Sequence, residues 1–165
     1  MANIAKVYRQ SMGATRFIGK KYGDSDRVDG MFGAKWGEWF ENGWFTAIEN
    51  QWNEKPFEDT EAHIGLMREN KEGKFEYWIG CFTPENTTVP EGYQYVDFPT
   101  GELGVCWIYG KENEVYMNEG ASAKRLQKEG YKLADEWCFE RYTCPRFTTP
   151  DENGNIILDV CFFIE

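Results

Sequence analysis

Basic charge and histidine are both scarce in this sequence. Lys and Arg number 18 against 28 Asp and Glu, which gives a formal net charge of −10. Proteins that bind nucleic acid present a basic face that displaces counterions, so this balance argues against direct nucleic-acid binding and favours cationic or neutral ligands. His63 is the only histidine. A histidine-activated nucleophile would have to use it, although a histidine at the start of a strand is more often simply exposed.

Long apolar runs and paired cysteines are also absent. No window approaches the roughly 20 apolar residues of a membrane span, and the first residues lack the apolar core of a signal peptide. The five cysteines are an odd number without any C-x-x-C spacing, and no glycine-rich phosphate loop occurs. We therefore expect a cytoplasmic protein with reduced, buried thiols, no membrane partner, no metal site and no cofactor.

Aromatic residues, in contrast, are abundant. Phe, Tyr and Trp make up 17% of the chain, with seven Trp, nine Tyr and twelve Phe. This is roughly double an ordinary aromatic content and more than a core of this size requires. We expect some of these rings to line a ligand surface. The 165 residues are enough for a single domain, 1–165, with a sizeable core.

Hydrophobic periodicity divides the chain into two similar halves, and the first half spans residues 14–82. Its pattern switches from strand-like to helical and back, which predicts the order strand, helix, strand, strand. The expected elements are a strand over 14–22, a helix from Met31 that ends at Asn42-Gly43, a helical turn over 44–51, a loop around Pro56, and strands over 63–68 and 75–82.

The second half, residues 95–164, repeats this order after a connector over 83–94 that is rich in proline and polar residues. Two such units about a pseudo-twofold axis would form one antiparallel-rich sheet with two helices packed on it, an α+β fold with a groove at the axis. The expected elements are a strand over 95–109 broken at Pro99-Thr100-Gly101, a helix over 115–129 with Met117, Ala121 and Leu126 on its apolar side, strands over 139–147 and 156–164, and a turn over 150–155 between them.

The stretch from Trp137 to Phe147 is typical of a strand with a carboxylate, Glu140, at its centre. Alternation predicts that Glu140 shares its face with thiols and a phenol, without a basic residue beside it. The expected faces are Cys138, Glu140, Tyr142 and Cys144 on one side and Trp137, Phe139, Arg141 and Thr143 on the other. Such a carboxylate lies at a solvated sheet surface, is paired to a distant Lys or Arg, or is kept in a pocket for an external partner.

Four short motifs carry a resemblance to a known family. They are Tyr77-Trp78-Ile79-Gly80, Pro90-Glu91-Gly92-Tyr93, Phe98-Pro99-Thr100-Gly101 and Phe139-Glu140-Arg141-Tyr142. In this order and spacing, over residues 14–164, the chain resembles the gyrase-inhibitor-like (GyrI-like) small-molecule-binding domain, also called the bacterial (AraC-type) effector-binding domain, here in stand-alone form. The resemblance implies that Glu140 contacts bound cationic, aromatic compounds.

Six aromatic residues are further candidates for ligand contact, with core packing as the alternative for each. Trp36 and Trp39 lie three apart on the first helix and can form an aromatic wall. The other four lie on strands of the two halves: Trp78, Trp107, Tyr142 and Phe163.

Two functions follow from the resemblance and the residues together. The first is stand-alone binding of a hydrophobic, aromatic, often cationic small molecule, with Glu140 as counter-charge and the rings as walls. The alternative is a hydrolase that opens the strained cyclopropane of DNA-alkylating natural products, in which Glu140 would deprotonate a water and Tyr142 would help to hold the substrate. A weaker third hypothesis is a protein partner, as for the gyrase inhibitor itself. No helix-turn-helix is expected, and we expect a monomer or weak dimer.

Overall fold

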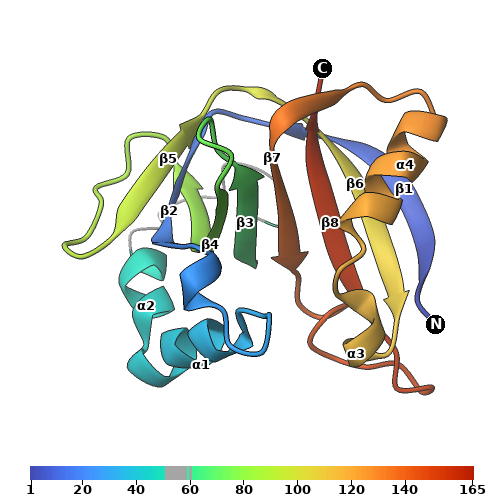
Figure 1. The fold of residues 1–165 in the computed structure, drawn as a ribbon, viewed down its shortest axis with the longest axis horizontal. Coiled ribbons are helices and arrows are strands. Elements are labelled where there is room, and N and C mark those ends of the chain that lie inside the picture. Colours follow the sequence, from blue (N-terminus) through green and yellow to red (C-terminus); the bar gives the residue numbers. More distant parts are fainter. Residues whose placement is uncertain (51–58, 60) are drawn as a thin grey trace. The chain divides into compact units, whose positions relative to one another are not determined.

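The computed structural model describes residues 1–50, 59 and 61–165. The fold is α+β, as predicted, and the chain divides into two compact units (Figure 1). Unit 1 consists of Met1–Met12 and Gly101–Glu165, and unit 2 consists of Gly13–Thr100. The predictions made for Gln51 and Pro56 fall outside the described residues. None of the helices in the described part of the chain is long and apolar enough to cross a membrane.

In the described part of unit 2, four strands form antiparallel pairs in the order β3-β4-β2-β5. The chain passes from β2 through two helices to β3 and β4, which is the predicted strand, helix, strand, strand order. The elements are β2 (Thr15–Tyr22), the 3-10 helix η1 (Asp24–Asp26), α1 (Gly33–Asn42), α2 (Trp44–Glu49), β3 (His63–Glu69), β4 (Phe75–Pro84) and β5 (Gln94–Phe98).

Unit 1 repeats this connectivity. Its strands form antiparallel pairs in the order β1-β6-β8-β7, so β6, β8 and β7 correspond to β2, β4 and β3 of unit 2. The elements are β1 (Asn3–Met12), β6 (Gly101–Gly110), α3 (Glu112–Val115), α4 (Glu119–Lys128), β7 (Leu133–Tyr142) and β8 (Ile156–Ile164).

Two edge strands differ from the prediction. The sequence gives no strand before Ala14, yet β1 pairs with β6 from Asn3↔Tyr109 to Met12↔Gly101. The expected strand over 95–109 divides at its Pro-Thr-Gly break, and its first part, β5, pairs with β2 in unit 2. Local periodicity identifies a strand but not its partner. β5 and β6 are separate strands because β5 pairs with β2, whereas β6 pairs with β1 and β8.

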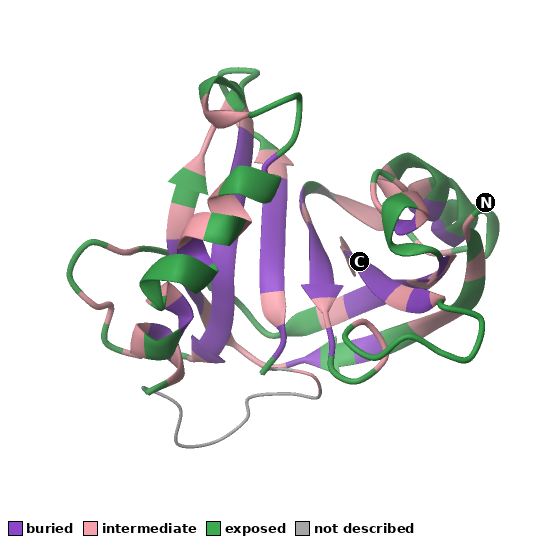
Figure 2. Ribbon diagram, turned by 90° about the horizontal axis from the view of Figure 1, so that it is seen from below, coloured by how far each residue is buried: buried purple, intermediate pink, exposed green. Residues whose placement is uncertain are grey.

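The helix α1 begins and ends close to its predicted limits. Gly43 follows its last residue in the left-handed conformation, with φ of 65°, which a glycine adopts without strain. The inner face buries Trp39 completely, while Phe40 on the outer side is 61% exposed. In Figure 2 the central strands are mostly purple, whereas the helices carry much of the green.

The prediction of a single helix over 115–129 is wrong, because the chain forms two helices, α3 and α4, with a break between them. Met117 has a φ of 62° and the Asn118 side chain donates to the carbonyls of Glu114, Val115 and Tyr116, which closes α3. Val115 and Leu126 are fully buried, but the expected apolar residue Met117 is 81% exposed. Ala121 is exposed as well.

The strand predicted over 139–147 begins earlier and ends earlier. β7 runs from Leu133 to Tyr142, and the chain then forms turns in which the Phe147 amide donates to the Thr143 carbonyl at 2.8 Å. Pro145 has no amide proton and so cannot continue a strand ladder. The predicted hairpin turn before β8 is present, with the Gly154 amide bonded to the Asp151 carbonyl at 2.9 Å.

Candidate functional site

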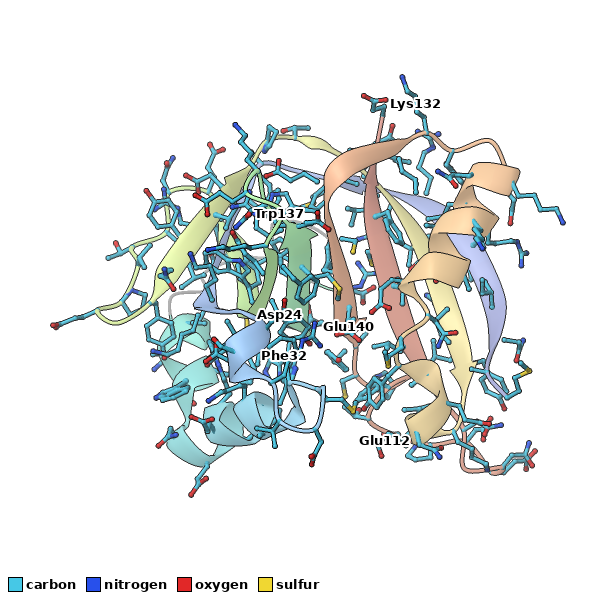
Figure 3. All side chains as sticks on the ribbon, viewed as in Figure 1. Asp24, Phe32, Glu112, Lys132, Trp137 and Glu140 are labelled. Carbon is cyan, nitrogen blue, oxygen red and sulfur yellow. The ribbon has the colours of Figure 1, made fainter. Side chains whose placement is uncertain are left out.

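Glu140 lies on the side of the unit 1 sheet that α3 and α4 cover. It is directly opposite Val160 of β8, so the two side chains project from the same face. Val160 belongs to the core cluster that includes Val115 of α3 and Leu126 of α4. Glu140 is only 6% exposed, so a carboxylate enters an otherwise apolar layer. Figure 3 marks Glu140 on β7 and Glu112 on α3.

The predicted alternation of β7 is confirmed within the strand. Trp137, Phe139 and Arg141 are buried on the face opposite Glu140. Cys138 and Tyr142, which share the Glu140 face, are half-buried. Cys144 was expected to continue this face, but it lies beyond the end of β7 and is exposed.

Two other carboxylates act on the groups beside Glu140. Burial raises the pKa of the Tyr116 phenol strongly, and the charges of Glu112 and Glu140 raise it further. The Tyr116 hydroxyl donates to Glu112 Oε1 at 3.3 Å. Burial likewise raises the pKa of the Cys138 thiol to about 12, with added contributions from Glu119 and Glu140.

We call this set the Glu140 corner: Glu140, Tyr116, Cys138, Glu112 and Glu119. Its phenol and thiol are neutral at physiological pH, and the charges that act on their pKa values are all negative. A negative field in a partly desolvated, aromatic setting favours a bound cation. The corner can therefore attract positive charge and offer it a ring.

Tyr142 lies near this corner but also packs in the core. Its ring meets Phe147 edge to face, with ring centroids 4.7 Å apart, and both rings pack against the cluster beneath the helices. Tyr142 is thus on the same side of the sheet as Glu140, as predicted from the alternation.

Trp107 and Phe163 lie on the other face of the unit 1 sheet. Trp107 of β6 is opposite Asp159 of β8, and Asp159 is in turn opposite Arg141 of β7. The Trp107 indole donates to the Tyr8 hydroxyl at 3.1 Å. Phe163 contacts Phe139, with ring centroids 5.7 Å apart. These two predicted ligand residues are therefore separated from Glu140 by the sheet of their own unit.

A buried ionic network occupies this second face. Arg141 and Asp159 are both fully buried, and Arg141 Nε donates to Asp159 Oδ2 at 2.8 Å. Arg146 Nε donates to Asp159 Oδ1 at 2.8 Å, and Gln10 accepts from Arg141. Burial acts to lower the pKa of Arg141, but neighbouring Cys161 and Asp159 outweigh it, so the pKa of Arg141 is raised. The network fixes the position of Arg141 within β7, next to Glu140 in the chain.

The three tryptophans predicted to contact ligand in unit 2 are divided between two faces in the same way. Trp36 Nε1 donates to the Tyr77 hydroxyl at 3.0 Å, which places Trp36 over the helix-covered side of β4. Trp39 Nε1 donates to the Tyr22 hydroxyl at 3.0 Å. Trp78 follows Tyr77 in the strand and so projects to the other side, where it contacts Phe17.

The sequence did not identify Tyr116, Glu112 or Glu119 as site residues. Tyr116 and Glu119 lie in the helix predicted over 115–129 and Glu112 lies just before it, where acidic residues indicate a solvated face. The break after α3 brings Tyr116 close enough to β7 for the charge of Glu140 to act on its pKa, and the exposed Glu112 accepts from its hydroxyl. Among the described residues, no group of three or more His, Cys, Asp or Glu is arranged to hold a metal ion.

Comparison with solved structures identifies related folds at low sequence identity. SAV2435 bound to tetraphenylphosphonium is 15% identical with a TM-score of 0.71, covering 97% of this chain and 94% of that one. An integron cassette protein of Vibrio cholerae is 12% identical with a TM-score of 0.57, covering 99% of each chain. A hydrolase from Listeria innocua is 11% identical with a TM-score of 0.54, covering 97% and 92%.

At these identities the likenesses show the fold alone. Comparison with curated proteins gives no match. A family model described as Cass2, integron-associated effector binding protein, matches residues 11–159. The match covers most of the chain and confirms the predicted GyrI-like resemblance. The protein belongs to the Cass2 family of integron-associated effector binding proteins.

Proposed function

We propose that this protein binds a hydrophobic, aromatic cation, and that Glu140 supplies the counter-charge. The observation that carries the proposal is the burial of Glu140, which is 6% exposed, beside the Tyr116 phenol and the Cys138 thiol. At this degree of burial a carboxylate attracts a nearby cation more strongly than it would at a solvated surface. The tetraphenylphosphonium complex of SAV2435, which has a similar fold, supports a ligand of this class.

The interaction energies are sufficient for such a role. Two unit charges about 4 Å apart attract by about 4 kcal/mol at an effective dielectric near 20, before desolvation offsets part of this. A cation over an aromatic ring adds about 0.5 to 2 kcal/mol. One charge and several rings specify shape loosely, so we expect affinity for a range of flat or propeller-shaped cations.

The proposal is tested by replacing Glu140 with Gln, which keeps the size and hydrogen bonding of the side chain but removes its charge. We expect the dissociation constant for tetraphenylphosphonium to rise roughly 5- to 150-fold, corresponding to about 1 to 3 kcal/mol, in isothermal titration calorimetry. Binding of the neutral analogue triphenylphosphine oxide should change little. Glu152→Gln, an exposed residue in the turn before β8, is the control with the same change in net charge.

Equal affinities of the Glu140→Gln and Glu152→Gln proteins for tetraphenylphosphonium would contradict the proposal. Equal losses for the cation and the neutral analogue would also contradict it, because a counter-charge acts on the cation only.

A hydrolase is the second candidate, and its support is the similarity in fold to a hydrolase from Listeria innocua. Glu140 would act as general base toward a water, and the Tyr116 ring would pack against the substrate. For a neutral, cyclopropane-bearing polycyclic compound, Glu140→Gln should then lower turnover by about 100-fold or more while binding persists. Product formation measured by chromatography decides this, and no product with the wild-type protein would exclude hydrolysis of that compound.

A further inference from the structure

A lysine ammonium lies between two aromatic rings in unit 2, and the proposed function does not involve it. Lys20 of β2 places its Nζ 4.6 Å from the ring centroid of Trp44 and 4.5 Å from that of Tyr93. Both distances are within the roughly 6 Å over which a cation is attracted to a ring face. The same Nζ donates to the Gly92 carbonyl oxygen at 2.9 Å.

A third ring, Trp39, packs against these two rings, and other contacts hold them in place. Trp39 is nearly perpendicular to both rings, with its centroid 5.8 Å from that of Trp44 and 6.0 Å from that of Tyr93. Trp39 is fully buried and anchored by its bond to the Tyr22 hydroxyl. The Tyr93 hydroxyl donates to the Trp44 carbonyl at 2.6 Å. The walls are therefore preorganised.

The conformation of a short turn explains one of the sequence motifs. The Tyr93 amide donates to the Pro90 carbonyl at 3.2 Å, which closes the turn Pro90-Glu91-Gly92-Tyr93. Gly92 has a φ of 87°, which a residue with a side chain would adopt only under strain. The turn places the Gly92 carbonyl and the Tyr93 ring together at the Lys20 ammonium.

Lys20 is held less firmly than the rings around it. In the described part of the chain its ammonium forms no ion pair, and the Gly92 carbonyl is its hydrogen-bond acceptor. Lys20, Trp44 and Tyr93 are all half-buried, so solvent reaches the enclosure. A flexible four-carbon chain can leave while the anchored rings stay.

We propose that Trp39, Trp44, Tyr93 and the Gly92 carbonyl, the Lys20 box, form a binding site for quaternary ammonium ligands that Lys20 occupies when no ligand is bound. A quaternary ammonium is more weakly hydrated than a lysine ammonium and needs no hydrogen-bond acceptor, so the ring faces of Trp44 and Tyr93 suit it, with Trp39 packed against both rings. Because Lys20 competes for the box, the apparent affinity for ligand is reduced by the fraction of time that the box is open.

The test is calorimetric titration of choline and of its neutral isostere 3,3-dimethyl-1-butanol into the wild-type protein and two variants. Lys20→Met keeps the length of the side chain but removes its charge. Lys21→Met makes the same change in net charge at the adjacent, exposed residue, which projects from the other side of β2. We expect Lys20→Met to bind choline about ten-fold or more tightly than wild type, whereas Lys21→Met stays near wild type.

Equal choline affinities of the Lys20→Met and Lys21→Met proteins would overturn the proposal, as would equal binding of choline and the neutral alcohol to Lys20→Met. Adding Trp44→Leu to the Lys20→Met protein should abolish its gain in choline affinity. Adding Glu140→Gln should leave choline binding unchanged, because every residue of the Lys20 box belongs to unit 2 and Glu140 to unit 1. Loss of choline binding with Glu140→Gln would assign it to the Glu140 corner and refute the Lys20 box, whatever the outcome for tetraphenylphosphonium.

Discussion

Replacing Asp159 with Asn should destabilise the protein severely, because it leaves buried guanidinium charge without its carboxylate. Asp159 is fully buried and accepts hydrogen bonds from Arg141, Arg146 and the Thr143 hydroxyl. Arg141 is fully buried as well. Asn keeps the shape of the side chain, so the change is chiefly in charge.

The expected cost follows from the burial of both partners. Removing one member of a buried ion pair typically costs about 3 to 5 kcal/mol, since the remaining charge stays in a poorly solvating environment. The whole free energy of unfolding of such a domain is only about 5 to 15 kcal/mol. For a chain of this length each kcal/mol lowers the melting temperature by about 2 to 4 °C, so we expect a decrease of about 6 to 20 °C.

Urea denaturation followed by far-ultraviolet circular dichroism measures this cost. The matched control is Glu102→Gln in β6, which breaks the pair with Arg9, joined at 2.8 Å, whose side chains are 40% and 47% exposed. An exposed pair contributes about 0 to 1 kcal/mol, so the control should be near wild type. The reasoning would be refuted if Asp159→Asn cost no more than Glu102→Gln.

Two further predictions concern unit 2. In Gly80→Ala the added Cβ would lie 2.0 Å from the Ile18 carbonyl oxygen, so the free energy of unfolding measured in urea should fall by about 3 kcal/mol or more. The control Gly120→Ala, whose Cβ meets nothing within 4 Å, should not be destabilised. Equal stability of the two variants would contradict this close approach. Burial acts to raise the pKa of Glu76, but hydrogen bonds from Asn70, Arg68 and Trp78 outweigh it, so its pKa lies below the ordinary 4.5. The stabilisation from Glu76 should therefore be complete above about pH 4.5 and lost as the pH falls through the lower folded-state pKa. The difference in free energy of unfolding between wild type and Glu76→Gln should then shrink in acid. A difference that grows in acid would contradict this.

Local patterns in the sequence were sufficient to predict most elements of both units. Alternation and turn residues gave β2, β3, β4 and β8, and a glycine at the helix end gave α1. β1 could not be found in this way because Asn3–Met12 has no clear alternation of polar and apolar residues, and its pairing with β6 is what makes it a strand. The break between α3 and α4 depends on three hydrogen bonds from Asn118, which periodicity does not register.

The candidate site was predicted in part. Strand alternation placed Glu140 with Cys138 and Tyr142, and the structure adds that Glu140 is buried. Tyr116 could not be assigned, because it lies more than 20 residues from Glu140 in the chain and approaches it only through packing of α3 on the sheet. Glu112 joins the site only through its hydrogen bond with Tyr116. Trp39 was predicted as part of a ligand wall, but its neighbours Trp44 and Tyr93 were not. The contacts of the Lys20 ammonium with these two rings join distant parts of the chain, which local patterns do not show. Contact of the predicted rings with ligand stays a prediction.

The most direct test of the central claim is a crystal structure of the protein with tetraphenylphosphonium. The account predicts the phosphonium centre within about 6 Å of the Glu140 carboxylate, the range over which an opposite charge acts strongly, with a phenyl ring against Tyr116. A well-occupied ligand whose phosphorus lies beyond a Debye length of about 8 Å from Glu140 would contradict it.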